Sequence, residues 1–110
     1  LLPASRTDRV ATDEIFGPVL SVLPFEDEAD AIALANATVY GLSGSVWTRD
    51  LGRALRVSRG VESGTISVNS HSSVRYTTPF GGMKRSGLGR ELGADAALAF
   101  TQTKNVFFAS

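Results

Sequence analysis

The chain has 110 residues and a mass of 11.6 kDa, the size of one domain that can bury roughly two thirds of its unfolded surface. Hydrophobic residues make up 43% and charged residues 20%, which argues against disorder. Eleven basic residues offset eleven acidic residues, and there is no cysteine. This composition disfavours nucleic-acid binding and excludes disulfides and a cysteine nucleophile among these residues.

No apolar run reaches the ~18 residues that span a bilayer, and the first ten residues lack the basic and then apolar regions of a secretion signal. We therefore expect a cytoplasmic protein without a membrane segment. The sequence opens at Leu1, inside what reads as a strand or loop, and this opening is typical of a fragment.

The first part of the chain predicts a strand followed by a helix. Residues 1–18 read as an irregular lead-in that ends in a turn, and the apolar run at 19–25 suits a short buried strand. Asp27 then has the place of an N-cap, with an acid three residues later. Apolar residues at helical spacing continue to about Asn36, where we expect the helix to end.

The same pattern repeats further along the chain. Residues 42–48 predict a strand, Asp50 can cap a helix that Gly60 ends, and residues 65–69 predict the next strand. Strands that alternate with helices of about ten residues are typical of a parallel sheet. The predicted fold class is therefore α/β, with a parallel βαβαβ sheet unit.

The last third of the chain begins with a long loop. Residues 70–89 contain four glycines and no clear period, and a loop of this length is usually functional. Residues 90–100 predict a helix, and residues 102–109, with three large apolar side chains, predict a final strand.

The loop departs from two glycine motifs of nucleotide-binding proteins at one required position each. The dinucleotide fingerprint has Leu92 in place of its third glycine, and the phosphate loop has Leu88 in place of its lysine. Residues 83–85 read more simply as a solvated turn. We predict no metal site.

Three segments together form a more specific pattern. They read Glu-Ile-Phe-Gly-Pro-Val at residues 14–19, Asn-Ala-Thr-Val-Tyr-Gly-Leu at 36–42 and Pro-Phe-Gly-Gly-Met-Lys-Arg-Ser-Gly at 79–87. In this order and at this spacing, the chain closely resembles the C-terminal part of the catalytic domain of NAD(P)-dependent aldehyde dehydrogenases. The resemblance covers nearly the whole chain, from about residue 13 to residue 106.

The resemblance implies that Glu14 and Phe16 contact the cofactor, NAD or NADP. In the family, the glutamate holds the nicotinamide ribose and the phenylalanine packs beside the nicotinamide. A carboxylate can accept hydrogen bonds from two neighbouring hydroxyls, and a flat ring restricts the nicotinamide. From the residues alone, a solvated Glu14 and a core Phe16 are the favoured alternative, and the resemblance reverses that preference.

The resemblance also implies that the segment 70–80 borders the entry tunnel of the aldehyde substrate. Phe80 matches an apolar wall position. Val74 falls where relatives often carry an aromatic residue, and a smaller side chain there widens the tunnel.

The predicted strand at 102–109 resembles the strand through which family members pair with a neighbouring subunit. This implies a homo-oligomer and two regions, residues 1–101 of the catalytic domain and residues 102–110 as an oligomerisation strand. An apolar strand at the chain end is aggregation-prone unless another strand covers it. The alternative is an ordinary edge strand of the chain's own sheet.

In the family, the cysteine nucleophile, the general base and the dinucleotide-binding half lie upstream of residue 14. We therefore predict no catalytic residue in this chain, which alone is expected to be inactive. The intact enzyme is expected to oxidise an aldehyde to a carboxylic acid through a cysteine thioester. Two alternatives remain: a non-catalytic strand-pairing module and a phosphate-binding loop at 83–90, which the neutral net charge disfavours.

Overall fold

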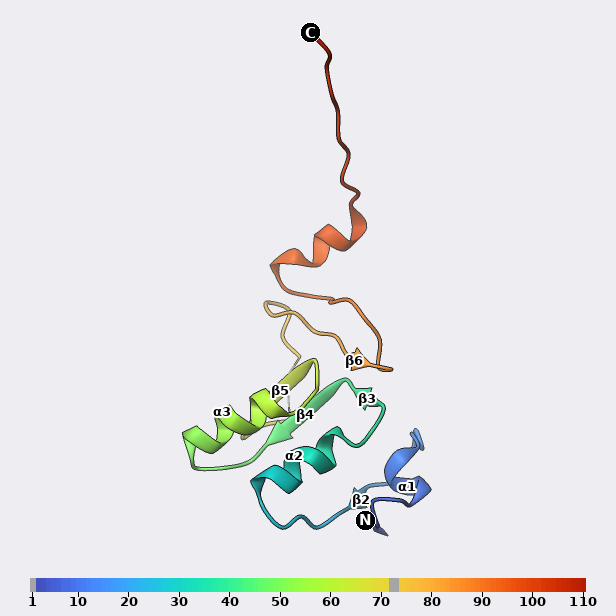
Figure 1. Ribbon diagram of the computed structural model, residues 1–110, viewed down its shortest axis with the longest axis vertical. Helices are drawn as coiled ribbons and strands as arrows, with labels where there is room; N and C mark the ends of the chain where they lie inside the picture. Colours follow the sequence, from blue (N-terminus) through green and yellow to red (C-terminus); the bar gives the residue numbers. More distant parts are fainter. Residues whose placement is uncertain (1, 72–73) are drawn as a thin grey trace.

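A computed structural model describes residues 2–71 and 74–110, and within this part of the chain the strands form three two-stranded sheets (Figure 1). The strands are β1 (Leu2–Pro3), β2 (Ser21–Val22), β3 (Tyr40–Gly41), β4 (Ser43–Val46), β5 (Thr65–Val68) and β6 (Met83–Lys84). β1 pairs with β2 and β4 with β5 in parallel, whereas β3 pairs with β6 in an antiparallel arrangement. The helices are α1 (Arg9–Thr12), α2 (Glu28–Asn36), α3 (Leu51–Gly60) and the 3₁₀ helix η1 (Ala94–Phe100).

Side-chain caps determine where the two longer helices begin. The Asp27 carboxylate accepts a hydrogen bond from the Asp30 amide at 2.8 Å, and the Asp50 carboxylate accepts one from the Arg53 amide at 3.0 Å. Each bond satisfies an amide that has no partner within its helix. Both predicted caps, and the helices that follow them, are confirmed.

The unit β4–α3–β5 is the most regular part of the fold. Ser43 is opposite Thr65 and Val46 is opposite Val68, so the two strands pair along their full length. The amide of Asn69 donates to the Val46 carbonyl at 2.8 Å and extends this pairing by one residue. The predicted strand, helix and parallel strand are confirmed here.

The first strand of the predicted βαβαβ sheet does not join β4 and β5. Of residues 19–25, only Ser21–Val22 form a strand, and that strand pairs with Leu2–Pro3 in a separate sheet. Pro18 and Pro24 lie close to either end and have no N–H to donate to a neighbouring strand. The prediction of one continuous three-stranded sheet is therefore wrong for this chain.

The predicted loop and helix at 70–100 also differ in detail. The loop is partly ordered by β6 and by a backbone bridge between Phe80 and Glu91. The helix is shorter and tighter than expected, because Glu91 is held in that bridge and Leu92 and Gly93 have positive φ angles of 61° and 71°. A right-handed helix cannot pass through such residues.

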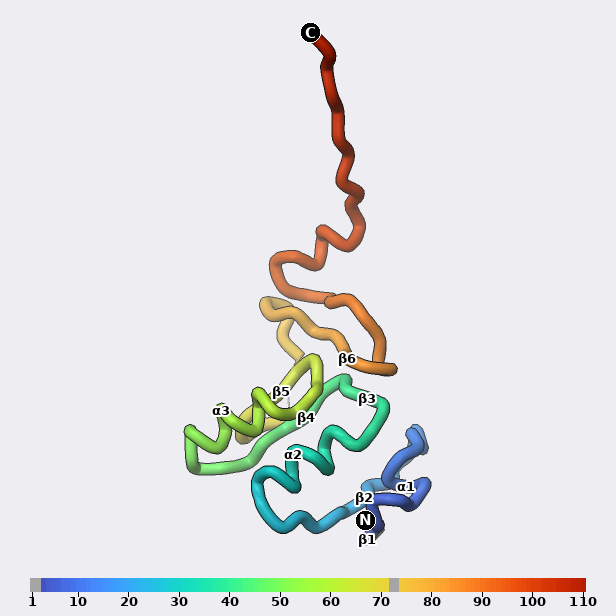
Figure 2. The backbone as a smooth tube through the Cα atoms, in the orientation of Figure 1, coloured from blue at the N-terminus to red at the C-terminus, as the bar shows by residue number. Residues whose placement is uncertain are grey.

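The predicted strand at 102–109 is absent from the chain as the structure describes it. Residues 101–110 have no strand or helix assignment. They run away from the rest of the molecule to the end of its longest axis, as Figure 2 shows. A strand requires a backbone partner, and this tail lies beyond the reach of the three sheets.

The chain alone encloses almost no core. Its accessible surface is 8870 Å², against about 5,800 Å² for a compact protein of this mass. The radius of gyration is 18.3 Å, against about 13 Å for a compact domain of this length. Ala54 and Ser67 are the two buried side chains among the described residues, at 4% and 8% exposure.

Candidate functional site

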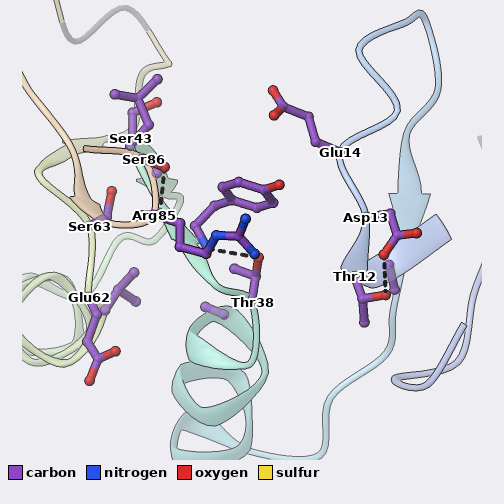
Figure 3. A pocket seen from close by; sticks show the side chains of 16 residues that line it. Thr12, Asp13, Glu14, Thr38, Ser43, Glu62, Ser63, Arg85 and Ser86 are labelled. Atoms are coloured by element: carbon purple, nitrogen blue, oxygen red, sulfur yellow. Dashed lines mark hydrogen bonds between the residues drawn. The ribbon is translucent and has the colours of Figure 1, made fainter. Parts of the chain in front are cut away.

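A surface cavity of about 650 Å³ separates the N-terminal segment from β3 and β6 (Figure 3). Its lining comes from residues 11–14, from the stretch between α2 and β4, from residues 61–63 and from residues 85–86. All three segments quoted in the sequence analysis therefore contribute to one cavity, although they are far apart in the chain.

Glu14 lies on one side of this cavity. Figure 3 shows its side chain extending from the N-terminal segment toward the side that carries Arg85 and Ser86. Glu14 is exposed, and within the described residues its carboxylate has no hydrogen bond or ion pair. Its oxygens are therefore available to accept hydrogen bonds from a ligand.

Phe16 does not share this position. Its side chain is 93% exposed, its φ angle is 53°, and it is not one of the residues that line the cavity. Of the two residues expected to hold the cofactor, the structure brings Glu14 to the cavity and leaves Phe16 outside it.

Asp13 lies next to Glu14 on the same side of the cavity but is engaged by a neighbour. The Arg9 guanidinium donates to its carboxylate at 2.9 Å. This hydrogen bond lowers the pKa of Asp13 below its usual value, with smaller contributions from the charge of Arg9 and from Thr12. Glu14 is thus the carboxylate on this side that is left for a ligand.

The opposite wall is held together by contacts between β3 and the residues after β6. The Arg85 amide donates to the Val39 carbonyl at 3.0 Å, and the Gly41 amide donates to the Ser86 hydroxyl at 3.0 Å. The sequence pattern predicted a solvated turn at 83–85. Lys84 instead has a largely covered side chain, at 22% exposure.

Two of the three cationic side chains in the loop at 83–90 donate to carbonyl oxygens of the chain. The Lys84 ammonium donates to the carbonyls of Asn36 and Thr38. Arg90 donates from Nη1 to the carbonyls of Gly82 and Gly89, at 2.8 and 2.6 Å. Carbonyl oxygens thus occupy donors of Lys84 and Arg90 that a phosphate would need. Among the described residues, Arg85 is the cation of this loop whose side chain has no hydrogen bond or ion pair, so a phosphate-binding loop at 83–90 would depend on Arg85.

Phe80 and Val74 do not line the same cavity. Phe80 exchanges two backbone hydrogen bonds with Glu91, at 2.8 and 2.7 Å, and lines a second cavity of about 620 Å³ together with Leu42, Leu88 and Phe100. Val74 is 53% exposed and is not among the residues that line that cavity. The two residues expected at the substrate tunnel are therefore not brought together in this chain.

Residues 2–71 and 74–110 contain no group of three or more His, Asp or Glu side chains that could hold a metal ion. Over the same ranges, every helix is too short to cross a bilayer.

Curated proteins that are similar to this chain include dehydrogenases of aldehydes. An aldehyde dehydrogenase of Emericella nidulans is 46% identical over 100 residues, which are 91% of this chain and 20% of the relative. Phenylacetaldehyde dehydrogenase of Pseudomonas fluorescens is 48% identical over 101 residues, 92% of this chain and 20% of the relative. The chain thus spans about a fifth of the length of the relatives it matches.

The solved structures of two aldehyde dehydrogenases are also similar to this chain. An NAD-dependent aldehyde dehydrogenase from Sinorhizobium meliloti superposes with a TM-score of 0.88 at 44% identity, over 92% of this chain and 20% of that one. A Mycobacterium tuberculosis aldehyde dehydrogenase complexed with NAD+ gives a TM-score of 0.86 at 44% identity, over 90% of this chain and 20% of that one. The model of the aldehyde dehydrogenase family matches residues 2–106. With this match over nearly its whole length, the chain belongs to the aldehyde dehydrogenase family.

Proposed function

We propose that this chain is the part of an NAD(P)-dependent aldehyde dehydrogenase that holds the nicotinamide ribose and forms one section of the substrate tunnel. The complete enzyme converts an aldehyde to a carboxylic acid. Its cysteine nucleophile belongs to polypeptide outside these residues, because none of the 110 residues is a cysteine.

The observation that carries this proposal is the position of Glu14. Its carboxylate is exposed, extends into the cavity and has no partner among the described residues (Figure 3). The rest of the cavity is lined by the two other segments that resemble the family, including Tyr40 and Ser86. A carboxylate that is covered or already paired would not support cofactor binding.

The chemistry of Glu14 suits the sugar of a nicotinamide nucleotide. A carboxylate accepts hydrogen bonds at both oxygens, and hydrogen bonds to an ionised acceptor are stronger than those between neutral groups. Two adjacent ribose hydroxyls are donors of matching spacing. The residues therefore fit this end of the cofactor, which supplies the chemistry of accepting the hydride that the aldehyde loses.

Phe16 and Phe80 would act by restricting orientation. The ring of Phe16 is almost fully exposed and free to cover a flat group that approaches Glu14 from outside the cavity. Phe80 is fixed by its bridge to Glu91 and offers an apolar surface to the hydrocarbon part of an aldehyde. Correct orientation of the reacting groups accelerates the reaction without a chemical role for either ring. On this proposal Val74 leaves the tunnel wider than an aromatic residue would.

The experiment replaces Glu14 by glutamine in the complete polypeptide that carries this segment. Glutamine keeps the size of the side chain and one acceptor oxygen but removes the charge. We expect the Kd for NAD+ or NADP+, measured by calorimetry, to rise by about tenfold, the effect of one lost charge-assisted hydrogen bond.

Glu26→Gln is the matched control, since Glu26 is exposed and lies outside this cavity. Its affinity for the cofactor should equal that of the unchanged protein. Equal cofactor affinity of Glu14→Gln and Glu26→Gln would remove Glu14 from the cofactor site.

The tail at 102–110 supports a second role, the pairing of subunits. Val106, Phe107 and Phe108 are 62%, 83% and 86% exposed, and the tail has no strand partner within the described chain. An extended apolar segment of this kind is suited to add as a strand to a sheet edge of another subunit. The same segment could serve a non-catalytic module that pairs with other chains.

A further inference from the structure

Lys84 joins three segments that are distant in the sequence. Its ammonium donates to the carbonyl of Asn36 at 3.0 Å and to the carbonyl of Thr38 at 3.1 Å, and it contacts Oε2 of Glu62 at 2.9 Å. Two of the three ammonium protons are thus donated to backbone carbonyls, and the charge is paired with the Glu62 carboxylate. Lys84 does not itself line the cavity at Glu14, so any effect on that cavity must pass through the residues that it holds.

Asn36 and Glu62 are also bonded to each other, which closes the set of contacts. The Glu62 amide donates to Oδ1 of Asn36 at 2.8 Å, and Nδ2 of Asn36 donates to the Gly60 carbonyl at 2.7 Å. Asn36, Glu62 and Lys84 thus form a ring of contacts, called here the Asn36–Glu62–Lys84 network. It fixes the end of α2, the start of the segment that leads to β5, and β6 relative to one another.

The network supports a backbone that is unfavourable in isolation. Lys84 has a φ angle of 54°, in the left-handed region that residues with a side chain rarely adopt. Such a conformation persists only where surrounding contacts enforce it. Two sets of contacts act on this residue: those of the Lys84 side chain and the pairing of its backbone with Tyr40 of β3.

The residues that follow Lys84 form the cavity wall opposite Glu14. Arg85 and Ser86 line the cavity and are bonded to Val39 and Gly41 of the neighbouring segment. A change in the backbone at Lys84 would move this wall, because Arg85 is the next residue and Ser86 the one after it. The distance between the wall and Glu14 therefore depends on Lys84.

We infer that Lys84 is a positioning residue for the cofactor cavity: through the Asn36–Glu62–Lys84 network it sets the wall that faces Glu14, and so sets the affinity for the nicotinamide-ribose end of the cofactor. This inference rests on the proposed function. On this inference Lys84 makes no contact with the cofactor itself, because it does not line the cavity and its ammonium is bonded within the chain.

The test uses Lys84→Met in the complete polypeptide. Methionine keeps the length and apolar body of the side chain and removes its three donors. Arg59→Met is the matched control, since Arg59 is an exposed cation on α3 with no hydrogen bond or ion pair among the described residues and lies outside the cavity. Glu62→Gln removes one contact of the network and should have an intermediate effect.

The first readout is amide hydrogen exchange without cofactor. In Lys84→Met, the amides of Gly41 and Arg85 should exchange about tenfold faster, while amides in the β4–β5 sheet stay unchanged. Unchanged exchange at Gly41 and Arg85, or faster exchange throughout the protein, would overturn the inference, because the first result means no positioning and the second means general destabilisation.

The second readout separates binding from turnover. Lys84→Met should raise KM for NAD+ or NADP+ by about fivefold, with kcat changed by less than about twofold. A lower kcat at unchanged KM would instead indicate a smaller folded fraction and would contradict the inference. If the unchanged protein binds neither cofactor, the proposed function fails, and amide exchange alone then decides whether Lys84 positions the wall.

Discussion

Asn69 illustrates how a single side chain can complete a sheet where the backbone has turned away. Its Oδ1 accepts from the Thr48 amide at 2.9 Å, and its Nδ2 donates to the Thr48 carbonyl at 3.0 Å. The side chain thus makes the two hydrogen bonds that a paired strand residue would make. Its φ angle of 52° lies in the left-handed region, which asparagine tolerates better than most residues.

Replacing Asn69 tests both effects. Asn69→Ala loses the two side-chain hydrogen bonds and puts a methyl group in the left-handed region, so we expect a loss of about 1–2 kcal/mol in the free energy of unfolding. Asn69→Gly loses the same hydrogen bonds but favours the backbone conformation, and should cost less. Urea unfolding midpoints measure the difference. If glycine were as destabilising as alanine, the backbone conformation would contribute nothing.

Lys84 has the same left-handed backbone conformation as Asn69, but its side chain bonds to other segments of the chain. The sequence pattern predicts a solvated Lys84, because a lysine next to an arginine in a glycine-rich loop is normally a surface residue. Its three acceptors come from residues 22 to 48 positions earlier in the chain, and no local pattern encodes their approach.

At the scale of elements, one carboxylate connects α2 to α3. Glu28 receives two hydrogen bonds from Arg56, at 2.6 and 2.8 Å, and a further contact from Arg53 at 3.5 Å. The helices also approach closely at Gly60, where a Cβ atom would lie 2.9 Å from the side chain of Ile32. The absence of a side chain at Gly60 lets the two helices pack, and the ion pair fixes their relative position.

The ion pair makes this packing sensitive to pH. The hydrogen bond from Arg56, followed by the charges of Arg56 and Arg53, lowers the pKa of Glu28 below its usual value. A carboxyl whose pKa is lowered by folding stabilises the fold above its ordinary pKa, and this stabilisation is lost as the pH falls through the lowered value. The contribution is therefore present at neutral pH and disappears in acid.

We expect Arg56→Met to lower the Tm at pH 7 and to have a smaller effect as the pH falls below about 4, the ordinary range of a glutamate. Thermal unfolding of both proteins across this range provides the measurement. Arg59→Met, on the same helix, should show no such pH dependence. A difference between Arg56→Met and the unchanged protein that grows in acid would contradict the sign of this argument.

At the scale of the whole molecule, large apolar side chains remain at the surface. Trp47 is 66% exposed, Phe25 is 61% exposed and Phe100 is 92% exposed. The chain spans about a fifth of the length of its relatives. We expect other parts of the complete polypeptide to cover these side chains, because removing large aromatic surfaces from water is favourable.

The prediction at the scale of the whole molecule concerns the tail at 102–110 and the mass of the assembled protein. If the tail pairs subunits as proposed, removal of residues 102–110 from the complete polypeptide should lower the mass of the assembled protein, because the segment that adds to a neighbouring sheet is lost. Light scattering coupled to gel filtration measures the mass. Val106→Asp together with Phe108→Asp is the companion variant, since charges in the same tail should have the same effect. An unchanged mass in both variants would end the proposal that this tail pairs subunits.

The sequence by itself determined the elements whose cause is local. The caps at Asp27 and Asp50 and the strands that flank α3 were predictable because a capping carboxylate and a short strand-forming segment between turn residues act within a few residues. The family was also predictable from three short segments, since their order and spacing are properties of the sequence alone.

Only the tertiary structure decided how those elements meet. It placed β2 in a different sheet from β4 and β5. It bonded the Lys84 ammonium to the carbonyl of the last residue of α2, and it brought Glu14 but not Phe16 to the cavity. These outcomes depend on which backbone groups from distant segments approach one another, and hydrogen-bond partners at such separations leave no periodic signal in the sequence. The physical reason is that strand pairing and side-chain burial require two segments of the chain to meet, whereas a local sequence pattern describes only one of the two segments.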